Sequence, residues 1–135
     1  MTSKMPWLPL VGRILIGIMF VLAGISKAGA IVGTTKYIAS KGLPAAQILT
    51  YLTIIFEIVA GAMLIVGYRT WIAASALAIF CVLTAVIFHN YWSMQGAAVR
   101  INQVFFMKNL AIAGGLLAFA YFGSGPLGLD SRKGG

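Results

Sequence analysis

Residues 46–67 read AQILTYLTIIFEIVAGAMLIVG, and this stretch decides the fold class. An α-helix needs about 20 mostly apolar residues to cross the hydrocarbon core of a bilayer, and the stretch meets that length. Its one acidic or basic side chain, Glu57, lies near the middle. A charged group at that depth costs about 2.5 to 3.5 kcal/mol unless a partner or a function retains it. We therefore predict a transmembrane helix that carries a candidate functional acid.

Three further segments on either side of this stretch have the same length and apolar character, at about 7–27, 70–89 and 102–122. The four spans occupy most of the 135 residues, which leaves no room for a soluble catalytic domain. In the first loop, residues 37–41 could form a short interfacial helix that Gly42 and Pro44 would end. We predict an all-α membrane protein, with residues 1–135 forming a single four-transmembrane-helix bundle with short loops.

The composition agrees with a membrane location. Apolar residues make up 61% of the chain and charged residues 9%, and the mean hydropathy is +0.98, so a soluble domain of this size could not bury the apolar surface. The net charge is +8, but the cations are scattered between the spans. That distribution suits contacts with the lipid bilayer and gives no concentrated surface for nucleic acid. Cys81 lies within an apolar run, and we interpret it as a small packing residue.

The flanking cations do not select an orientation. An even number of spans puts both termini and the loop at Arg69 on one side, and the first and third loops on the other. Counting Lys and Arg gives a tie, with Lys4, Arg69, Arg132 and Lys133 on one side and Lys27, Lys36, Lys41 and Arg100 on the other. The positive-inside rule therefore makes no choice here.

Small residues recur along the spans and predict close helix packing. They form the pairs Gly17 and Gly24, Ala74 and Ala78, and Ala111 and Gly115. Small side chains let helix backbones approach closely in a membrane. We expect a tight bundle without a wide aqueous pore.

Two ionisable residues are predicted to pair inside the membrane. At about 1.5 Å per residue, Arg13 lies roughly 9 Å below the face that holds the termini, and Glu57 roughly 15 Å below the same face. A long guanidinium side chain can close such an offset. We predict an ion pair between Arg13 and Glu57.

A second polar group is predicted toward the opposite face. Lys108 lies roughly 9 Å below that face, close to the level of His89 and Lys27. One buried acid cannot neutralise both Arg13 and Lys108, so at least one cation needs another partner, such as a carbonyl, water or a ligand. Further members of the group could be Asn90 and Asn109.

The polar groups stand among aromatic residues, and that surrounding suits a quinone headgroup. The aromatic residues are Phe88, Trp92, Phe105 and Phe106. Two simpler interpretations stay open. Aromatic residues at span ends commonly anchor a helix at the membrane interface, and buried charges can serve only to neutralise one another and fix the helix register.

Other chemistry finds little support in the sequence. His89 could take up a proton or donate a hydrogen bond, but a single histidine is too little for a metal site, and we predict no metal. A haem site is formally open only through Met94 as a second ligand. The sequence contains no Ser-His-Asp set, glycine-rich phosphate loop or Cys-x-x-Cys motif, so whether the protein is an enzyme stays undecided.

Several motifs together, in order along nearly the whole chain, resemble the DoxX family. The first span carries Arg13 and ends in Ala23-Gly24-Ile25-Ser26-Lys27, Gly42-Leu43-Pro44 precedes the second, and Glu57 lies within it. Downstream come Gly67 and Arg69, His89-Asn90-Tyr91-Trp92, Phe106-Met107-Lys108-Asn109, Gly123-Ser124-Gly125-Pro126 and Leu129-Asp130.

The resemblance implies a four-helix, multi-pass protein of the bacterial inner membrane with both termini on one side. The family is named for a subunit of an archaeal thiosulfate:quinone oxidoreductase. By this resemblance we expect a subunit or accessory of a quinone-linked redox system, working with a redox partner protein. Lys108 and His89 would hold a quinone headgroup and Glu57 would tune it or relay protons, and Arg13 and Lys27 also match polar positions that recur in the family.

Two other functions are considered. The protein could be a non-catalytic membrane anchor or assembly protein, with Arg13 and Glu57 as an internal clamp. A small-solute transporter ranks last, because the two halves of the chain show no convincing internal match of the kind that transporters with inverted repeats contain.

Overall fold

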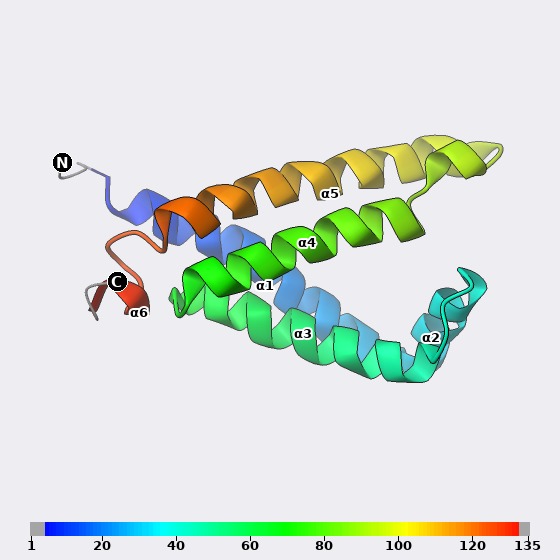
Figure 1. Cartoon of the computed structure of the whole chain (residues 1–135), viewed down its shortest axis with the longest axis horizontal. Coiled ribbons are helices and arrows are strands. Elements are labelled where there is room, and N and C mark those ends of the chain that lie inside the picture. The colour runs from blue at the N-terminus through cyan, green and yellow to red at the C-terminus, as the bar shows by residue number, and fades with distance from the viewer. Residues whose placement is uncertain (1–4, 133–135) are drawn as a thin grey trace.

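The structure is a computed structural model that describes residues 5–132, so Lys4 and Lys133 from the charge count lie outside it. Four helices are long and apolar enough to cross a membrane, which confirms the predicted fold class. These are α1 (Trp7–Ala28), α3 (Ala46–Val66), α4 (Thr70–Phe88) and α5 (Ala97–Phe122) (Figure 1). Three short elements complete the described chain: α2 (Ile31–Ser40), η1 (Tyr91–Ser93) and α6 (Leu129–Arg132).

Two helix boundaries differ from the prediction. The last long helix, α5, starts at Ala97 instead of residue 102, because its polar first turns, which include Arg100 and Asn102, lower the local hydropathy without preventing a helix. Gly96, with a φ of 67°, sets the start of this helix. The short helix α2 covers ten residues, more than the expected 37–41, because its helical hydrogen bonds begin already at Thr34, whose N–H bonds to Ala30 O.

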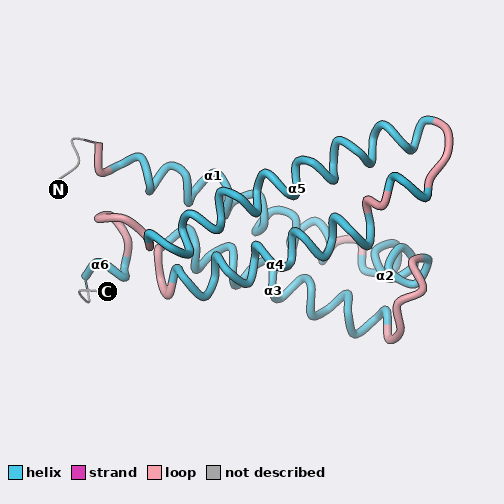
Figure 2. Tube along the Cα trace, turned by 45° about the horizontal axis from the view of Figure 1, so that its top comes forward, coloured by secondary structure: helices cyan, strands magenta, loops and turns pink. Residues whose placement is uncertain are grey.

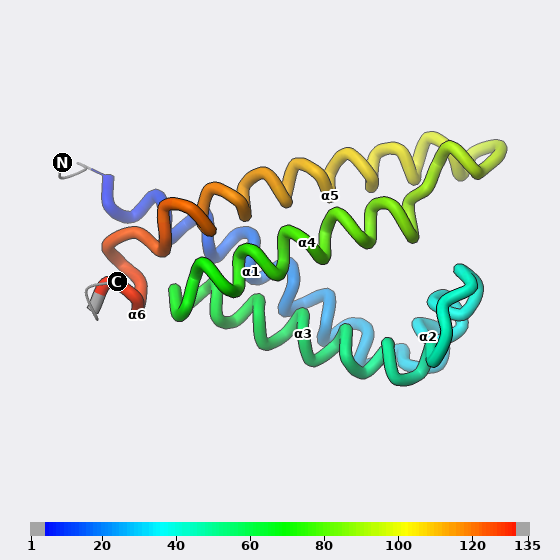
Figure 3. Tube along the Cα trace, in the orientation of Figure 1, coloured from blue at the N-terminus to red at the C-terminus, as the bar shows by residue number. Residues whose placement is uncertain are grey.

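The long helices form two antiparallel pairs. Helix α1 packs along α3, and α4 packs along α5, while the pairs meet mainly through α3 and α4. In Figure 3 the chain passes from one pair to the other through the tight turn between α3 and α4. This turn contains Gly67, whose φ of 72° suits glycine. The pairs lie close together at the end that holds α6 and diverge toward α2 (Figures 1 and 2).

Glycines set the close approach of α1 and α3. A Cβ atom added at Gly17 would lie 2.8 Å from Gly61 O, and one added at Gly61 would lie 2.9 Å from Gly17 O. At Gly24, an added Cβ atom would lie 2.6 Å from Ile58 Cγ1. The predicted packing through Gly17 and Gly24 is therefore confirmed, and these contacts also fix how residues of α1 align with residues of α3.

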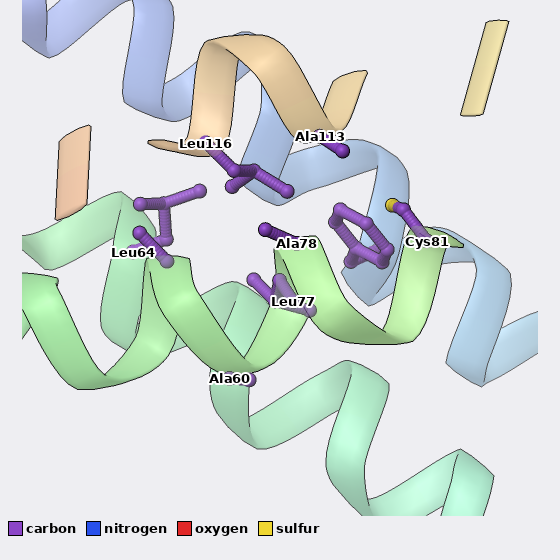
Figure 4. Packing of buried hydrophobic residues seen from close by; sticks show 9 residues of the cluster. Ala60, Leu64, Leu77, Ala78, Cys81, Ala113 and Leu116 are labelled. Atoms are coloured by element: carbon purple, nitrogen blue, oxygen red, sulfur yellow. The ribbon is translucent and has the colours of Figure 1, made fainter. Parts of the chain in front are cut away.

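All four long helices contribute to the buried core, which lies where the pairs meet (Figure 4). Ala74 and Ala78 are buried there, and Cys81 is 1% exposed, as expected for a packing residue. The other members are Phe20, Ala60, Leu64, Leu77, Ala113 and Leu116. Of the third predicted small-residue pair, Ala111 instead faces outward.

The outer surface of the bundle is apolar. Each long helix presents large side chains that are 58% to 66% exposed, namely Leu15, Ile55, Ile79 and Leu117. A soluble monomer rarely exposes continuous apolar surface on this scale. Such a surface fits the hydrocarbon core of a membrane.

Candidate ligand-binding cavity

A cavity of about 450 Å³ lies between the two helix pairs, on the side where they diverge. Its volume falls in the range of about 300 to 1,000 Å³ that is usual for small-molecule sites. Most of the cavity wall is apolar, and the residues that line it come from α1 to α5. Its polar members are Lys27, Thr34, Tyr37, Thr53, Glu57, Thr84, His89, Lys108 and Asn109.

An ion pair in the cavity wall joins α1 to α3. Lys27 Nζ donates a hydrogen bond to Glu57 Oε1 at 2.7 Å, and the two side chains are 33% and 3% exposed. Glu57 Oε2 has no hydrogen-bond partner among residues 5–132, yet it is not sealed inside the protein. Glu57 lines the cavity, and one of its oxygens is free of protein partners within the described chain.

The predicted pair of Arg13 with Glu57 is wrong, and the alignment of α1 with α3 explains why. Gly17 lies opposite Gly61, so Arg13 lies level with the last turn of α3, about eight residues or roughly 12 Å from Glu57 along the helix. A Cβ atom added at Gly24 would lie 3.4 Å from Glu57 Cβ, so Lys27, three residues further along α1, lies near the level of Glu57, and its long side chain closes the gap. Depths counted from the span ends could not show this, because close glycine contacts set the alignment.

His89 is oriented by a neighbour on α5. His89 Nδ1 lies 3.0 Å from Asn102 Oδ1, while Asn102 Nδ2 donates to Ala98 O at 2.9 Å. Because that bond turns the amide oxygen toward His89, the imidazole carries its proton on Nδ1 when neutral. The other nitrogen, Nε2, has no partner among the described residues and can accept a hydrogen bond from a ligand.

Lys108 brings a second cation to the cavity. It stands eleven residues into α5, about 16 Å from the start of that helix, so it lies deeper than a span starting at residue 102 implied. Within residues 5–132 it makes no hydrogen bond or ion pair. A cation without a partner at this depth needs water, lipid or a ligand to satisfy its three donors.

Aromatic rings form much of the remaining wall. Phe20 and Phe80 meet with ring centroids 6.4 Å apart, and Phe105 lies 5.2 Å from the ring of His89. Of the four aromatic residues predicted for the wall, Phe88 and Phe105 line the cavity. The other two, Trp92 and Phe106, do not line it and pack against each other with ring centroids 5.5 Å apart.

Helix α2 reaches across the divergent end, from one pair to the other. Tyr37 OH donates to Phe88 O at 3.3 Å, and Lys41 Nζ donates to Asn90 Oδ1 at 3.3 Å. The Tyr37 and Phe88 rings also pack together, tilted by 35°, with ring centroids 5.3 Å apart. Burial raises the pKa of Tyr37, so its hydroxyl keeps its proton and remains a donor.

Arg13 lies away from the cavity and is fully buried at the opposite end of the bundle. Its guanidinium donates to Leu64 O at 3.3 Å, Ile65 O at 2.7 Å and Leu127 O at 2.7 Å. Carbonyls in the last turn of a helix lack partners within the helix, and a cation there also opposes the negative end of the helix dipole. Arg13 thus joins α1, the end of α3 and the segment after α5.

Asp130 makes further contacts at this end of the bundle. We use the name terminal clasp for Arg13 with the carbonyls to which it donates, together with Asp130 and the backbone amides that donate to it. Asp130 Oδ1 accepts from Arg69 N at 2.7 Å and Oδ2 from Thr70 N at 2.8 Å, so the carboxylate caps the start of α4. Partial desolvation raises the pKa of Asp130. The hydrogen bonds from Thr70 and Arg69 and the charge of Arg13 outweigh this and hold the pKa below its ordinary value.

Comparison with known proteins adds the family. The DoxX family model matches residues 8–90. The chain is 35% identical to the inner membrane protein YphA of Escherichia coli K12 over 94% of this chain and 91% of that protein. It is 36% identical to the inner membrane protein YqjF of the same organism, over 90% of this chain and 88% of that protein. The chain belongs to the DoxX family. No solved structure gives a significant match.

In this DoxX protein, the structure brings four of the five predicted site residues to one cavity, namely Lys27, Glu57, His89 and Lys108, and places Arg13 elsewhere. The predicted member Asn109 also lines the cavity, whereas Asn90 bonds to Lys41. Sequence reasoning missed Asn102, the partner of His89. The available signal was a polar residue at the start of the span predicted for 102–122, but the sequence alone does not bring that residue beside His89.

The DoxX cavity can hold a small ring compound that carries oxygen atoms. It supplies ammonium donors, two open acceptors and flat apolar walls within one volume. Among residues 5–132 no group of three or more His, Cys, Asp or Glu side chains could hold a metal ion.

Proposed function

We propose that this protein binds a quinone headgroup in its cavity and serves as a membrane subunit or accessory of a quinone-linked redox system, together with a redox partner protein. The observation that carries the proposal is the cavity of about 450 Å³ that joins aromatic walls with Lys108, His89 and the Lys27–Glu57 pair. The cavity lies between helices that are long and apolar enough to cross a membrane, which supports a ligand that is itself lipid-soluble.

The chemistry of the wall supports a ring with oxygen substituents over a simple alkyl chain. An alkyl chain would offer no hydrogen-bond partner to Lys108 or to the open atoms of Glu57 and His89, and a polar group that a ligand covers without bonding has a free-energy cost. A quinone ring fits between the aromatic side chains, and its carbonyl oxygens accept hydrogen bonds from lysine. Lys108 is the first donor we assign to it.

We further propose that the protein lies in the bacterial inner membrane with both ends of the chain on one side. An even number of spans supports the shared side, and the names of the two relatives support the membrane. Reporter fusions at each end, one active only in the cytoplasm and one only outside it, test the arrangement.

The test of the cavity is the quinone content of the purified protein. Wild type, Lys108→Met and His89→Ala are purified in mild detergent, checked for equal folding, and extracted for identification of bound quinone by mass spectrometry. Lys36→Met is the matched control, because it also removes an exposed lysine but that residue does not line the cavity. We expect near-stoichiometric quinone in wild type and in the control, and loss in both cavity variants.

Quinone at background in all four proteins would overturn the proposal. The function left standing would then be a non-catalytic membrane anchor or assembly protein, and the cavity polar groups would have a structural role only. Equal quinone in all four would place any bound quinone outside the cavity, which also contradicts the proposed site.

A further inference from the structure

Each helix pair contributes a cationic donor and an open acceptor to the cavity, beside the neutral polar side chains of Thr53, Thr84 and Asn109. On the α1–α3 pair these are Lys27 Nζ and Glu57 Oε2, and Glu57 is held by its other oxygen. On the α4–α5 pair they are Lys108 Nζ and His89 Nε2, and His89 is held by its other nitrogen. A ligand in this volume therefore meets an acceptor as well as a donor on both sides.

The two open acceptors distinguish the oxidation states of a ring ligand. A quinone carbonyl can only accept hydrogen bonds, so it uses the lysines and leaves Glu57 Oε2 and His89 Nε2 facing oxygen lone pairs. A ring hydroxyl donates one hydrogen bond and accepts others, so the reduced form can satisfy the lysines and both acceptors together. Leaving a shielded acceptor unpaired has a free-energy cost that the reduced form avoids.

Resting on the proposed function, we infer that the cavity binds the hydroquinone form of its ligand more tightly than the quinone form. The lysines discriminate little between the two forms, because a carbonyl oxygen and a hydroxyl oxygen both accept from an ammonium group. Glu57 Oε2 and His89 Nε2 decide the preference, and both act on the same ligand. A preference of about tenfold corresponds to one or two ordinary hydrogen bonds.

Asn102 is assigned as the positioning residue for one of these acceptors. Its Oδ1 accepts from His89 Nδ1 at 3.0 Å, and its own amide is fixed by the bond to Ala98 O. This arrangement keeps the proton on Nδ1 and the lone pair on Nε2. Without Asn102, the neutral imidazole could carry its proton on either nitrogen and would lose part of its preference for a hydroxyl donor.

The experiment compares the two oxidation states directly on the full-length protein in detergent. A short-chain alkyl-benzoquinone and its hydroquinone are each equilibrated with the protein across a dialysis membrane under anaerobic conditions, and the bound amounts are measured by chromatography. We expect the dissociation constant of the hydroquinone to be lower by about tenfold or more in wild type.

Variants separate the acceptors from the rest of the site. Glu57→Gln and Asn102→Leu should lower the ratio toward one, and Asn102→Leu covers the case in which Glu57→Gln does not fold, because Asn102 is only partly buried. Lys108→Met should weaken both forms by similar factors and leave the ratio unchanged. Gln103→Leu is the matched control, since this neighbour does not line the cavity.

The outcomes are distinct. Equal affinities, or tighter binding of the quinone, would overturn this inference and leave the quinone site intact. A wild-type preference that survives in both Glu57→Gln and Asn102→Leu would also overturn it, because the acceptors would not be its cause. If neither form binds, the proposed function falls as well.

Discussion

Arg13 Nη2 donates a hydrogen bond to Leu127 O at 2.7 Å, which ties the first membrane span to a segment that follows the last one. The same guanidinium bonds to two carbonyls at the end of α3. One buried side chain therefore connects parts of the chain that are more than a hundred residues apart, and its removal should affect the whole bundle.

Replacing Arg13 with methionine should destabilise the protein strongly. The substitution removes the guanidinium donor from three carbonyl oxygens, of which Leu64 O keeps a bond from Gly67 N–H, and we expect a loss of about 3 kcal/mol in the free energy of unfolding. Arg13→Lys should be intermediate, because one ammonium group cannot reach all three carbonyls in the same geometry. Thermal unfolding in detergent measures the effect. Arg100→Met, at an exposed arginine, should stay close to wild type.

The Lys27–Glu57 pair should behave as a unit. Lys27→Met leaves the buried Glu57 carboxyl without its partner, and we expect a loss of about 2 kcal/mol, less than for a fully buried pair because a third of Lys27 is exposed. The double variant Lys27→Met/Glu57→Met should recover most of that loss. A double-mutant cycle on unfolding free energies gives the coupling. If the double variant loses the sum of the two single losses, the pair is not coupled.

Stability should fall at acid pH through Asp130. Because the folded state holds the pKa of Asp130 below its ordinary value of 3.8, its carboxylate stabilises the fold above that pH. The contribution is lost as the pH falls from about 3.8 through the lowered value. Asp130 and Glu57 are the only two acidic residues in the chain, so the titration is simple to interpret. In melting temperatures measured across this range, Asp130→Asn should show a smaller decline than wild type.

The glycine contact between α1 and α3 should tolerate no side chain. In Gly61→Ala, the new methyl group would lie 2.9 Å from Gly17 O and must push the two backbones apart, at a cost of about 1 to 3 kcal/mol. Gly114→Ala is the control, because nothing lies within 4 Å of its added Cβ atom and alanine favours a helix. Equal stability of the two variants would contradict the close packing described for α1 and α3.

The spans could be predicted from the sequence because hydrophobic length alone defines them. The partner of Glu57 could not, because the choice between Arg13 and Lys27 depends on the alignment of two helices, and that alignment comes from glycine contacts between residues 44 positions apart. Likewise, placing Asn102 beside His89 requires the short η1 turn and the early start of α5. Local patterns identified which residues of the spans are polar, whereas packing decides which of them meet.

The angle between the two helix pairs links the end where they meet to the end where they diverge. Over a helix of about 20 residues, roughly 30 Å long, a tilt of about 6° between the pairs moves their far ends by about 3 Å. The width of the cavity thus depends on an angle set near Arg13 and Asp130 as much as on the side chains that line it. A ligand that spreads the pairs at one end would be felt at the terminal clasp, at the other end of the molecule.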